Sequence, residues 1–265
     1  MPEIKDLKWT IDTVASTYEK FRPGYTDELY KMIFDYVTLN DTCYAAEVGI
    51  GGGQATLPIL NTGCNLTAVE YGEEFTKLCK EKFKDDRNFS IITNKFEDTN
   101  FLEDTYDLVY SASAFHWVPE SIGYTKVFSM LKSGGAFARF ANHPYRDKGN
   151  LPLSEEMDRI YAEYYYKFYN KKQEIPTEYS EEQAMQRAKI AEKYGFVDIK
   201  YALFHRKRTF SADEYSTLLG TYSDHIAMEE GIRKEFFSKI ENAINNYGGS
   251  ITVYDTIDLQ LARKP

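Results

Sequence analysis

Short apolar runs alternate with segments of helical periodicity between residues 41 and 141. Between the runs, apolar positions recur at intervals of three and four, as in the stretch from Glu73 to Phe83. Strands separated by helices at this spacing imply parallel crossovers and a sheet that helices cover on both faces. The runs that we expect to form strands are Tyr44–Val48, Leu66–Val69, Phe89–Ile92, Tyr106–Tyr110 and Ala136–Phe140.

The flanking parts of the chain are richer in helical pattern. One helix is expected to begin at Thr26, and a tyrosine-rich helical segment runs from Leu153 to Lys171. The sequence therefore predicts an α/β fold, a Rossmann-like, seven-stranded, mostly parallel sheet with helices on both faces and a helical cap insertion. The remaining expected elements are a helix ending near Gly195, helices over Ala212–Thr221 and Ile232–Tyr247, and strands over Phe196–Phe204 and Ile251–Ala262.

Charge and composition exclude several classes of protein. The chain of 265 residues has 32 basic and 41 acidic side chains, so its net charge is −9, which argues against a nucleic-acid partner. The first residues do not have the pattern of a leader, and no apolar stretch approaches the roughly 18–20 residues that cross a bilayer. We therefore expect a cytoplasmic protein without a membrane partner. The three cysteines include no C-x-x-C pair, and His205 and His225 have no partner at metal-ligand spacing, so neither disulfides nor a metal site are expected.

The sharpest motif is the segment Glu47-Val48-Gly49-Ile50-Gly51-Gly52-Gly53-Gln54, which joins the first strand to the next helix. Glycines let the chain turn tightly and let a ligand approach the backbone, and open α/β sheets bind ligands at the carboxyl ends of their strands. The pattern is G-x-G-x-G, because Gln54 stands where a dinucleotide loop has its third glycine. Glu47 would repel a pyrophosphate and suits a ligand with a positive centre. The loop favours a cation-bearing nucleoside over a dinucleotide, and a tight turn without a ligand is the alternative.

Glu70 is an acidic residue at the end of the second expected strand. It follows Gly51 by 19 residues, close to the roughly 20 expected for an acid that binds a ribose diol. A carboxylate there accepts charge-assisted hydrogen bonds, each worth roughly 1.5–3 kcal/mol when shielded from water. The alternative is an exposed acid at a strand end.

With these features, residues 18–141 resemble the class I S-adenosylmethionine-dependent methyltransferases. The resemblance also rests on Asn94–Asp98, on the segment Tyr106–Ala112 and on the turn Leu131–Gly135, although Lys95 stands where the family often has an acid. It implies S-adenosylmethionine as cofactor, S-adenosylhomocysteine as product and in-line displacement at the sulfonium methyl. The implied cofactor-binding residues are Glu47, Gly49 and Gly51 at the methionine part, Glu70 at the ribose, Phe96 and Glu97 at the adenine, and Ser111 in the fourth-strand motif.

Two further segments indicate a branch of this family. The stretch Tyr18-Glu19-Lys20-Phe21-Arg22-Pro23-Gly24-Tyr25 matches the Y-x-x-x-R-P-x-Y opening of the trans-aconitate methyltransferase-like group within methyltransferase type 11. Ala114-Phe115-His116-Trp117-Val118 matches the short apolar segment of the same group. The resemblance implies a small-molecule acceptor, with a carboxylate as one option, and a lid in which Tyr18 and Arg22 contact the cofactor. The alternative is a tyrosine that packs against a helix and an arginine on the surface.

The resemblance also implies how the chain is organised. We expect a single methyltransferase domain over residues 1–265, present as a monomer or a homodimer. Its parts would be an N-terminal helical lid (1–40), a cofactor-binding core (41–141), a helical cap insertion (150–195) and C-terminal strands and helices that complete the fold (196–265). A general base is needed only if the attacking group must lose a proton, and a carboxylate needs none.

Candidate substrate contacts are sparse. His116 and Trp117 follow the fourth expected strand and His143 follows the fifth, so all three are candidates for the substrate pocket. Their alternative is ordinary packing or a loop position without a role. Two other functions stay open: a non-catalytic protein that binds S-adenosylmethionine or a nucleoside for regulation, and an NAD(P)-dependent oxidoreductase.

The aromatic content of 15%, with 22 tyrosines, is the unusual feature of the composition. Tyr161, Tyr165 and Tyr169 share one face of the expected helix, which fits core or interface packing. It also fits a cap helix with aromatic walls for an apolar or unsaturated substrate. The basic patches Lys171-Lys172 and Arg206-Lys207-Arg208 are expected to be solvated.

Overall fold

The computed structural model describes residues 11–146 and 149–265, which form two compact units. The core unit consists of residues 23–142, 179–204 and 257–265. The helical unit consists of residues 205–256 together with the described parts of 1–22 and 143–178. The finer division into lid, core and cap that the sequence implies stays a prediction.

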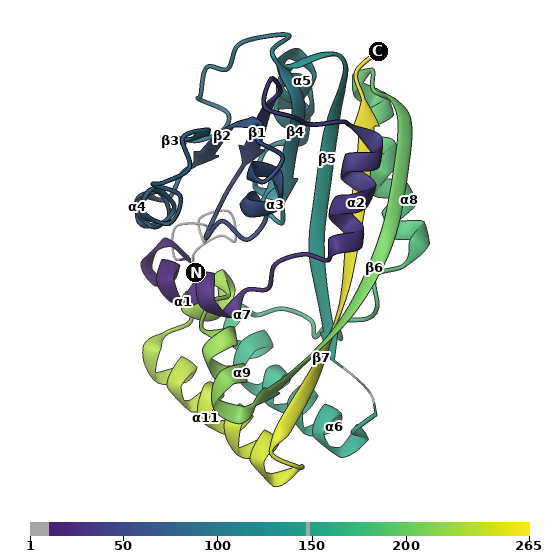
Figure 1. The fold of residues 1–265 in the computed structure, drawn as a ribbon. Helices are drawn as coiled ribbons and strands as arrows, with labels where there is room; N and C mark the ends of the chain where they lie inside the picture. Colours follow the sequence, from purple (N-terminus) through teal and green to yellow (C-terminus); the bar gives the residue numbers. More distant parts are fainter. Residues whose placement is uncertain (1–10, 147–148) are drawn as a thin grey trace. The chain divides into compact units, whose positions relative to one another are not determined.

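Seven strands form one sheet in the order β3-β2-β1-β4-β5-β7-β6 (Figure 1). Strand β1 pairs in parallel with β2 and β4, β2 with β3, and β4 with β5. Strand β7 is antiparallel to β5. At the start of β5, Gly134 N donates to Lys264 O just beyond the end of β7 (2.8 Å). Near the end of β5, the Tyr145 ring contacts the Tyr254 ring of early β7. The predicted Rossmann-like, mostly parallel sheet is confirmed. The strands are β1 (Tyr44–Val48), β2 (Asn65–Glu70), β3 (Phe89–Thr93), β4 (Tyr106–Ala112), β5 (Leu131–Arg146), β6 (Val197–Ser211) and β7 (Ser250–Arg263).

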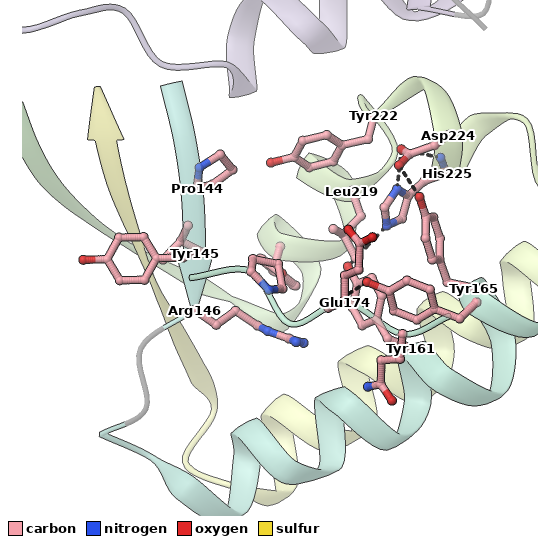
Figure 2. Close-up of a pocket in the computed structure, with 15 residues that line it drawn as sticks. Pro144, Tyr145, Arg146, Tyr161, Tyr165, Glu174, Leu219, Tyr222, Asp224 and His225 are labelled. Carbon is pink, nitrogen blue, oxygen red and sulfur yellow. Dashed lines mark hydrogen bonds and ion pairs between the residues drawn. The ribbon is translucent and has the colours of Figure 1, made fainter. Parts of the chain in front are cut away.

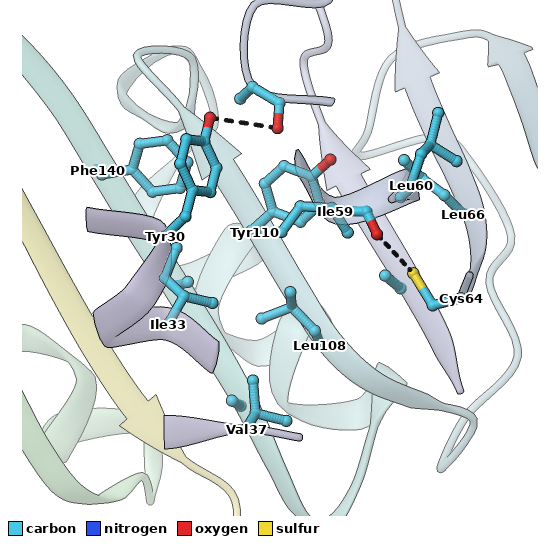
Figure 3. Packing of buried hydrophobic residues seen from close by; sticks show 14 of the residues in the cluster. Tyr30, Ile33, Val37, Ile59, Leu60, Cys64, Leu66, Leu108, Tyr110 and Phe140 are labelled. Atoms are coloured by element: carbon cyan, nitrogen blue, oxygen red, sulfur yellow. Dashed lines mark hydrogen bonds between the residues drawn. The ribbon is translucent and has the colours of Figure 1, made fainter. Parts of the chain in front are cut away.

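Helices cover both faces of the sheet in the core unit. Side chains alternate along the central strands, so apolar residues lie on both faces and each face packs against helices. Leu108 and Tyr110 of β4 lie in one apolar cluster with Tyr30 and Ile33 of the first covering helix (Figure 3). Val109 lies between them in sequence and belongs to the cluster on the other face. The helices of the first face are α2 (Asp27–Tyr36), α3 (Thr56–Leu60) and α4 (Glu73–Lys82); those of the other are α5 (Glu120–Met130) and the 3-10 helix η5 (Lys189–Tyr194), which continues α8 (Glu181–Ala188).

The helical unit has an apolar core of its own. Met157, Phe236 and Ile240 are fully buried there, and they come from the two longest helices of the unit. The helix that begins at residue 151 passes through one segment of π-helix, which coincides with the tyrosine cluster. The elements are η2 (Ile11–Val14), α1 (Ala15–Phe21), α6 (Leu151–Ile160), the π-helix η4 (Tyr161–Tyr166), α7 (Lys167–Tyr169), α9 (Ala212–Leu219), α10 (Ser223–Ile226) and α11 (Glu230–Asn246).

Strand β6 continues to Ser211, beyond the Phe204 that the sequence predicts. The prediction of a solvated basic patch is wrong for Arg206 and Arg208, whose side chains lie 3.2 and 2.6 Å from a carboxylate oxygen of Asp255. Asp255 is 1% exposed and belongs to β7. Residues two apart on a strand point to the same face, so both arginines reach one buried partner that lies far away in the sequence.

Strand β5 begins at Leu131, before the two glycines that the sequence assigns to a turn. Its pairing with β4 shifts from Tyr106–Leu131 to Leu108–Ala136. Residues 132–135 therefore stand opposite Asp107 alone, and Gly134 has a φ of +80°. The glycine pair forms a bulge within the strand, because a glycine accepts this backbone conformation without a Cβ penalty.

In the described ranges 11–146 and 149–265, no helix is both long enough and apolar enough to pass through a membrane. The same ranges contain no group of three or more His, Cys, Asp or Glu side chains placed to hold a metal ion.

Candidate active site

The glycine loop leaves β1 in the core unit and turns directly into α3. Gly49, Gly51 and Gly53 all have positive φ, at +74°, +53° and +73°. Gly49 N donates to Val69 O of β2 (2.9 Å), and a Cβ added to Gly49 would lie only 2.4 Å from the Cβ of Ala114. The loop after β1 therefore rests against the loop after β4, and only glycine fits at this contact.

Glu70, the last residue of β2, lies against the glycine loop. Its Oε2 accepts a hydrogen bond from Gly51 N (2.8 Å) and its Oε1 accepts one from Gly72 N (2.9 Å). A carboxylate accepts hydrogen bonds at both of its oxygens, and both oxygens of Glu70 do so here. The two backbone donors fix the carboxylate in one orientation beside the loop.

Glu47 is completely buried beneath the loop. Its Oε2 accepts hydrogen bonds from Thr56 Oγ1 (2.7 Å) and from the Tyr110 hydroxyl (2.8 Å). Its Oε1 is buried and has no hydrogen-bond partner among the described residues. Burial raises the pKa of Glu47, and the two hydrogen bonds lower it. Burial has the larger effect, so the pKa is raised to about 7. The sequence motif identifies Glu47 but not Thr56 or Tyr110, because nothing in the spacing shows that they donate to it.

Helix α4 holds the loop from its other side. Cys79 Sγ donates to Gly51 O (3.1 Å) and Lys82 Nζ donates to Gly52 O (3.0 Å). A Cβ on Gly53 would lie 2.8 Å from the Phe83 ring. At the end of the loop, the Nε2 of Gln54 is buried without a hydrogen-bond partner in the described part of the chain. The loop is thus rigidly supported and presents one unsatisfied acceptor, at Glu47, and one unsatisfied donor.

Comparison with known proteins shows what the chain is similar to. A family model described as a methyltransferase domain matches residues 46–138, which contain the loop and Glu70. An uncharacterised methyltransferase-like protein of Schizosaccharomyces pombe is 25% identical over 244 residues, which cover 91% of this chain and 88% of the relative. Residues 46–138 match the methyltransferase domain, and the protein is an S-adenosylmethionine-dependent methyltransferase.

Solved structures show the same fold for the methyltransferase. A type II methyltransferase from Anaeromyxobacter dehalogenans matches with a TM-score of 0.66 at 18% identity, covering 92% of this chain and 98% of the other. Phosphoethanolamine N-methyltransferase 2 of Haemonchus contortus, in complex with phosphomonomethylethanolamine and S-adenosylhomocysteine, has a TM-score of 0.57 at 13% identity. It covers 100% of this chain and 61% of the other. At these identities the structural matches show the fold alone.

The loop of the methyltransferase fits its cofactor, S-adenosylmethionine. The unsatisfied Oε1 of Glu47 is a buried acceptor that suits a cationic donor, and the Nε2 of Gln54 is a buried donor that needs an acceptor. Glu70 is a carboxylate at the end of β2 whose Oε2 is held by Gly51 N, the position from which an acid binds a ribose diol in open α/β sheets. A buried carboxylate with a raised pKa is also where a cationic ligand brings the largest electrostatic gain.

Other predicted cofactor contacts of the methyltransferase already have partners within the core unit. Ser111 is fully buried, and its hydroxyl donates to Val48 O (2.8 Å), so that it ties β4 to β1. The carbonyl oxygens of Phe96 and Glu97 both accept from Lys126 Nζ, at 2.6 and 3.0 Å. Lys126 therefore fixes the backbone of the predicted adenine segment. Contact of these residues with the cofactor stays a prediction.

His116 and Trp117 occupy the 3-10 helix η3 (Phe115–Trp117), two and three residues beyond the Ala114 that rests on Gly49. His116 is exposed and Trp117 half-buried, with their ring centroids 4.7 Å apart. Nearby, the Tyr25 hydroxyl of the opening motif lies 2.9 Å from Ser113 Oγ, which also accepts from Asn142 N. The backbone of Ser113 has a φ of +54°. His116 and Trp117 are thus attached to the loop that meets the glycine loop.

Tyr18, Arg22 and His143 fall in the helical unit of the methyltransferase. Arg22 donates to Thr221 Oγ1 and Thr221 O, both at 3.1 Å. Its guanidinium lies 4.0 Å from the ring centroid of Tyr222 and 5.0 Å from that of Tyr18. These contacts give Arg22 a structural role within its unit. The predicted roles of Tyr18 and Arg22 at the cofactor, and of His143 at the substrate, stay predictions.

Proposed function

We propose that this methyltransferase transfers the sulfonium methyl group of S-adenosylmethionine to a small-molecule acceptor that carries a carboxylate. The observation that carries the cofactor part is the contact of Glu70 Oε2 with Gly51 N at 2.8 Å, which sets a fixed diol-binding carboxylate beside the glycine loop. When bound, the cofactor supplies a methyl group that is already activated for displacement.

The residues of the chain act mainly by binding and orientation. Glu47 and Gln54 would hold the amino-acid end of the cofactor through buried atoms that have no hydrogen-bond partner within residues 11–146 and 149–265. Glu70 fixes the ribose, and the glycines keep side chains out of the path of the ligand. Alignment of the reacting groups and exclusion of water can account for as much as about 7–11 kcal/mol of the barrier in reactions of this kind.

Two side chains in the segment after β4, His116 and Trp117, support an acceptor that carries a carboxylate. His116 is an exposed imidazole beside an aromatic ring, a pair that suits an anionic group attached to a flat or apolar body. Small-molecule sites usually combine aromatic walls with a small number of placed polar groups. His116 and Trp117 are therefore our candidates for acceptor contact in the core unit.

Replacing Glu70 with alanine should weaken binding of S-adenosylmethionine at least tenfold. The change removes the acceptors of both ribose hydroxyls and also frees Gly51 N and Gly72 N, which the carboxylate now holds. Isothermal titration calorimetry measures the effect. Glu73→Ala is the matched control, since Glu73 is an exposed carboxylate three residues further on at the start of α4. Equal affinity in the Glu70 variant and the wild type would show that the ribose is bound elsewhere.

The acceptor part is tested with methyl-labelled cofactor and a panel of carboxylic acids, the corresponding amides and neutral alcohols. We expect label in acids and not in their amides. Transfer to the amides at the same rate would contradict the role of the carboxylate. Binding of the cofactor without transfer to any compound of a broad panel would instead favour a regulatory, non-catalytic protein.

A further inference from the structure

A cavity of about 220 Å³ lies wholly within the helical unit (Figure 2). Its wall includes Tyr161, Tyr165 and Tyr166 of the π-helix η4, so the tyrosine cluster surrounds an open space in addition to packing in the core. The remaining wall comes from the end of β5, from the segment that follows α7, from α9 and α10 and from β7. Segments of π-helix inside longer helices are found frequently at functional sites.

Six tyrosines line the cavity, and neighbouring rings contact one another. The ring centroid of Tyr165 lies 5.8 Å from that of Tyr161 and 5.1 Å from that of Tyr166. Leu219 and Val253 add buried apolar contact. Such a wall favours a flat, largely apolar ring as ligand. The six tyrosines are Tyr145, Tyr161, Tyr165, Tyr166, Tyr215 and Tyr222.

The polar groups on one side of the cavity already have partners. Asp224 Oδ1 accepts from His225 N (2.9 Å) and lies 2.8 Å from His225 Nδ1. Asp224 Oδ2 accepts from the Tyr165 hydroxyl (2.6 Å), and the Tyr161 hydroxyl lies 3.2 Å from His225 Nε2. These contacts hold two tyrosines of the wall in place and give Asp224 a hydrogen bond at each oxygen. The sequence shows His225 without a partner, because its partners are the adjacent acid and a tyrosine 64 residues away.

Arg146 lines the cavity with a polar atom that has no partner. Among the buried side-chain nitrogens and oxygens that lack a hydrogen bond in the described part of the chain, its Nη1 is the one that belongs to the lining. The guanidinium forms an ion pair with Asp158 and lies 5.0 Å from the ring centroid of Tyr161. Figure 2 shows the side chain extending from β5 toward the helices of the unit. A guanidinium carries five N–H donors, so Arg146 can bind an anion in addition to Asp158.

These groups favour an anionic ligand, although an aromatic wall by itself would also suit a cation. Asp224 already has donors at both oxygens, and Glu174 is exposed to water on the segment that follows α7. A second guanidinium, that of Arg22, lies 4.0 Å from the ring centroid of Tyr222 in the wall. A buried donor without a partner costs free energy, and an acceptor on the ligand removes that cost. A carboxylate therefore fits best at Nη1 of Arg146.

The volume of the cavity limits the ligand to a single ring. A protein cavity of about 150 Å³ accommodates a benzene molecule. The 220 Å³ found here therefore suits one ring with one or two small substituents. A carboxylate is one such substituent, and its place in the cavity is next to Arg146.

We propose that this cavity binds a monocyclic aromatic carboxylate, with the carboxylate at Nη1 of Arg146 and the ring among the tyrosines of the wall. The helical unit is then a ligand-binding unit in its own right, a role that goes beyond the methyl transfer proposed above. All the residues that line the cavity belong to this one unit, so binding requires neither the cofactor nor a residue of the core unit.

The ligand class is tested by calorimetry of the full chain, without cofactor, with benzoate, phenylacetate and 4-hydroxybenzoate as probes. We expect saturable binding of at least one acid. The amide of that acid has a similar shape without the charge, and it should bind at least tenfold more weakly. Benzyltrimethylammonium, a ring with a positive charge, should not bind.

Arg146→Gln tests the anion contact. The variant should bind the acid at least tenfold more weakly than the wild type does and the amide equally well, so that it no longer distinguishes the two. A merely structural role of Arg146 would change both affinities alike. Arg159→Gln is the matched control and should keep the wild-type affinities, since the side chain of Arg159 is 66% exposed on α6 and pairs with Glu156.

Leu219→Phe tests the position of the ligand. Leu219 is buried and lines the cavity, so a larger side chain takes up part of the space. The variant should bind the acid at least tenfold more weakly with Arg146 still in place, and it decides the location even if Arg146→Gln does not fold. Leu151→Phe makes the same change at an exposed position of α6 outside the lining, and should leave binding unchanged.

The outcomes are separate from those of the proposed function. Failure of all three acids to bind overturns the ligand class, and binding of the cation in their place overturns its charge. Equal binding of acid and amide by the wild type, or a preference for the acid that persists in Arg146→Gln, overturns the anion contact. Unchanged affinity in Leu219→Phe overturns the cavity as the binding site. A wild type that does not bind S-adenosylmethionine contradicts the proposed function and leaves these results unaffected, because the titrations contain no cofactor.

Discussion

Replacing Gly49 with alanine should abolish measurable binding of S-adenosylmethionine and lower the free energy of unfolding by about 3 kcal/mol. The new Cβ would stand 2.4 Å from that of Ala114, a separation that no pair of Cβ atoms tolerates. The φ of +74° adds strain, about 1–2 kcal/mol for a residue with a Cβ in this region. Overpacking a tight contact adds typically 1–3 kcal/mol. Urea unfolding and calorimetry with the cofactor measure the two effects.

Gly134→Ala separates strain from steric conflict. Gly134 has a similar φ of +80°, but a Cβ there would meet no atom within 4 Å. We therefore expect a loss of about 1–2 kcal/mol in that variant and no change in cofactor affinity. If Gly49→Ala behaves like Gly134→Ala, then the two loops separate easily and the loop after β4 does not support the cofactor site.

Replacing Glu47 with glutamine should weaken cofactor binding at least tenfold and remove a pH dependence of stability in the cofactor-free protein. The folded state raises the pKa of Glu47 from 4.5 to about 7, chiefly through burial. Between these values the folded state binds more protons than the unfolded state, so the free energy of unfolding falls as pH rises. Relative to Glu47→Gln, the free energy of unfolding of the wild type should therefore fall by about 3 kcal/mol between a pH below 4.5 and pH 8.

Glutamine is a conservative replacement at this position. Its amide oxygen can still accept from Thr56 and Tyr110, as Oε2 of Glu47 does, and its amide nitrogen takes the place of the unpartnered Oε1. What is lost is the negative charge that favours a cationic ligand. Urea unfolding across the pH range, with Glu81→Gln as an exposed control, measures the stability effect. A variant with the pH dependence of the wild type would show that Glu47 is ionised throughout.

The central strands were predictable because their signal is local. Leu108, Val109 and Tyr110 form an apolar run, and only a strand covered on both faces buries all three. The glycine spacing and the acid at the end of β2 predicted two parts of one ligand site. The structure adds the hydrogen bond between Gly51 N and Glu70 Oε2, which forms because both residues lie at the carboxyl ends of adjacent strands. Thr26 likewise predicted the start of α2, where its hydroxyl accepts from Leu29 N.

The length of β6 and the bulge in β5 were not predictable in the same way. The segment containing Arg206 and Arg208 looks like a solvated patch because charged residues are rarely buried. It continues the strand because Asp255 of the neighbouring strand pairs with both arginines. Gly134 looks like a turn, and its positive φ is the same in a bulge, so only the pairing with β4 distinguishes the two.

The sequence by itself determined the order of elements in the core unit and the glycine loop with its two acids. These features depend on periodicity and on short spacings, which the chain carries locally. The class of cofactor came from the resemblance of these motifs to a known family. Tertiary structure alone decided that Glu47 is buried against Thr56 and Tyr110, and that Asp224, His225 and Tyr161 form one chain of polar groups beside a cavity. Burial and hydrogen bonds between distant residues set the chemistry of a side chain, because they determine its solvation and its partners. The residues next to it in the sequence determine neither its solvation nor its partners.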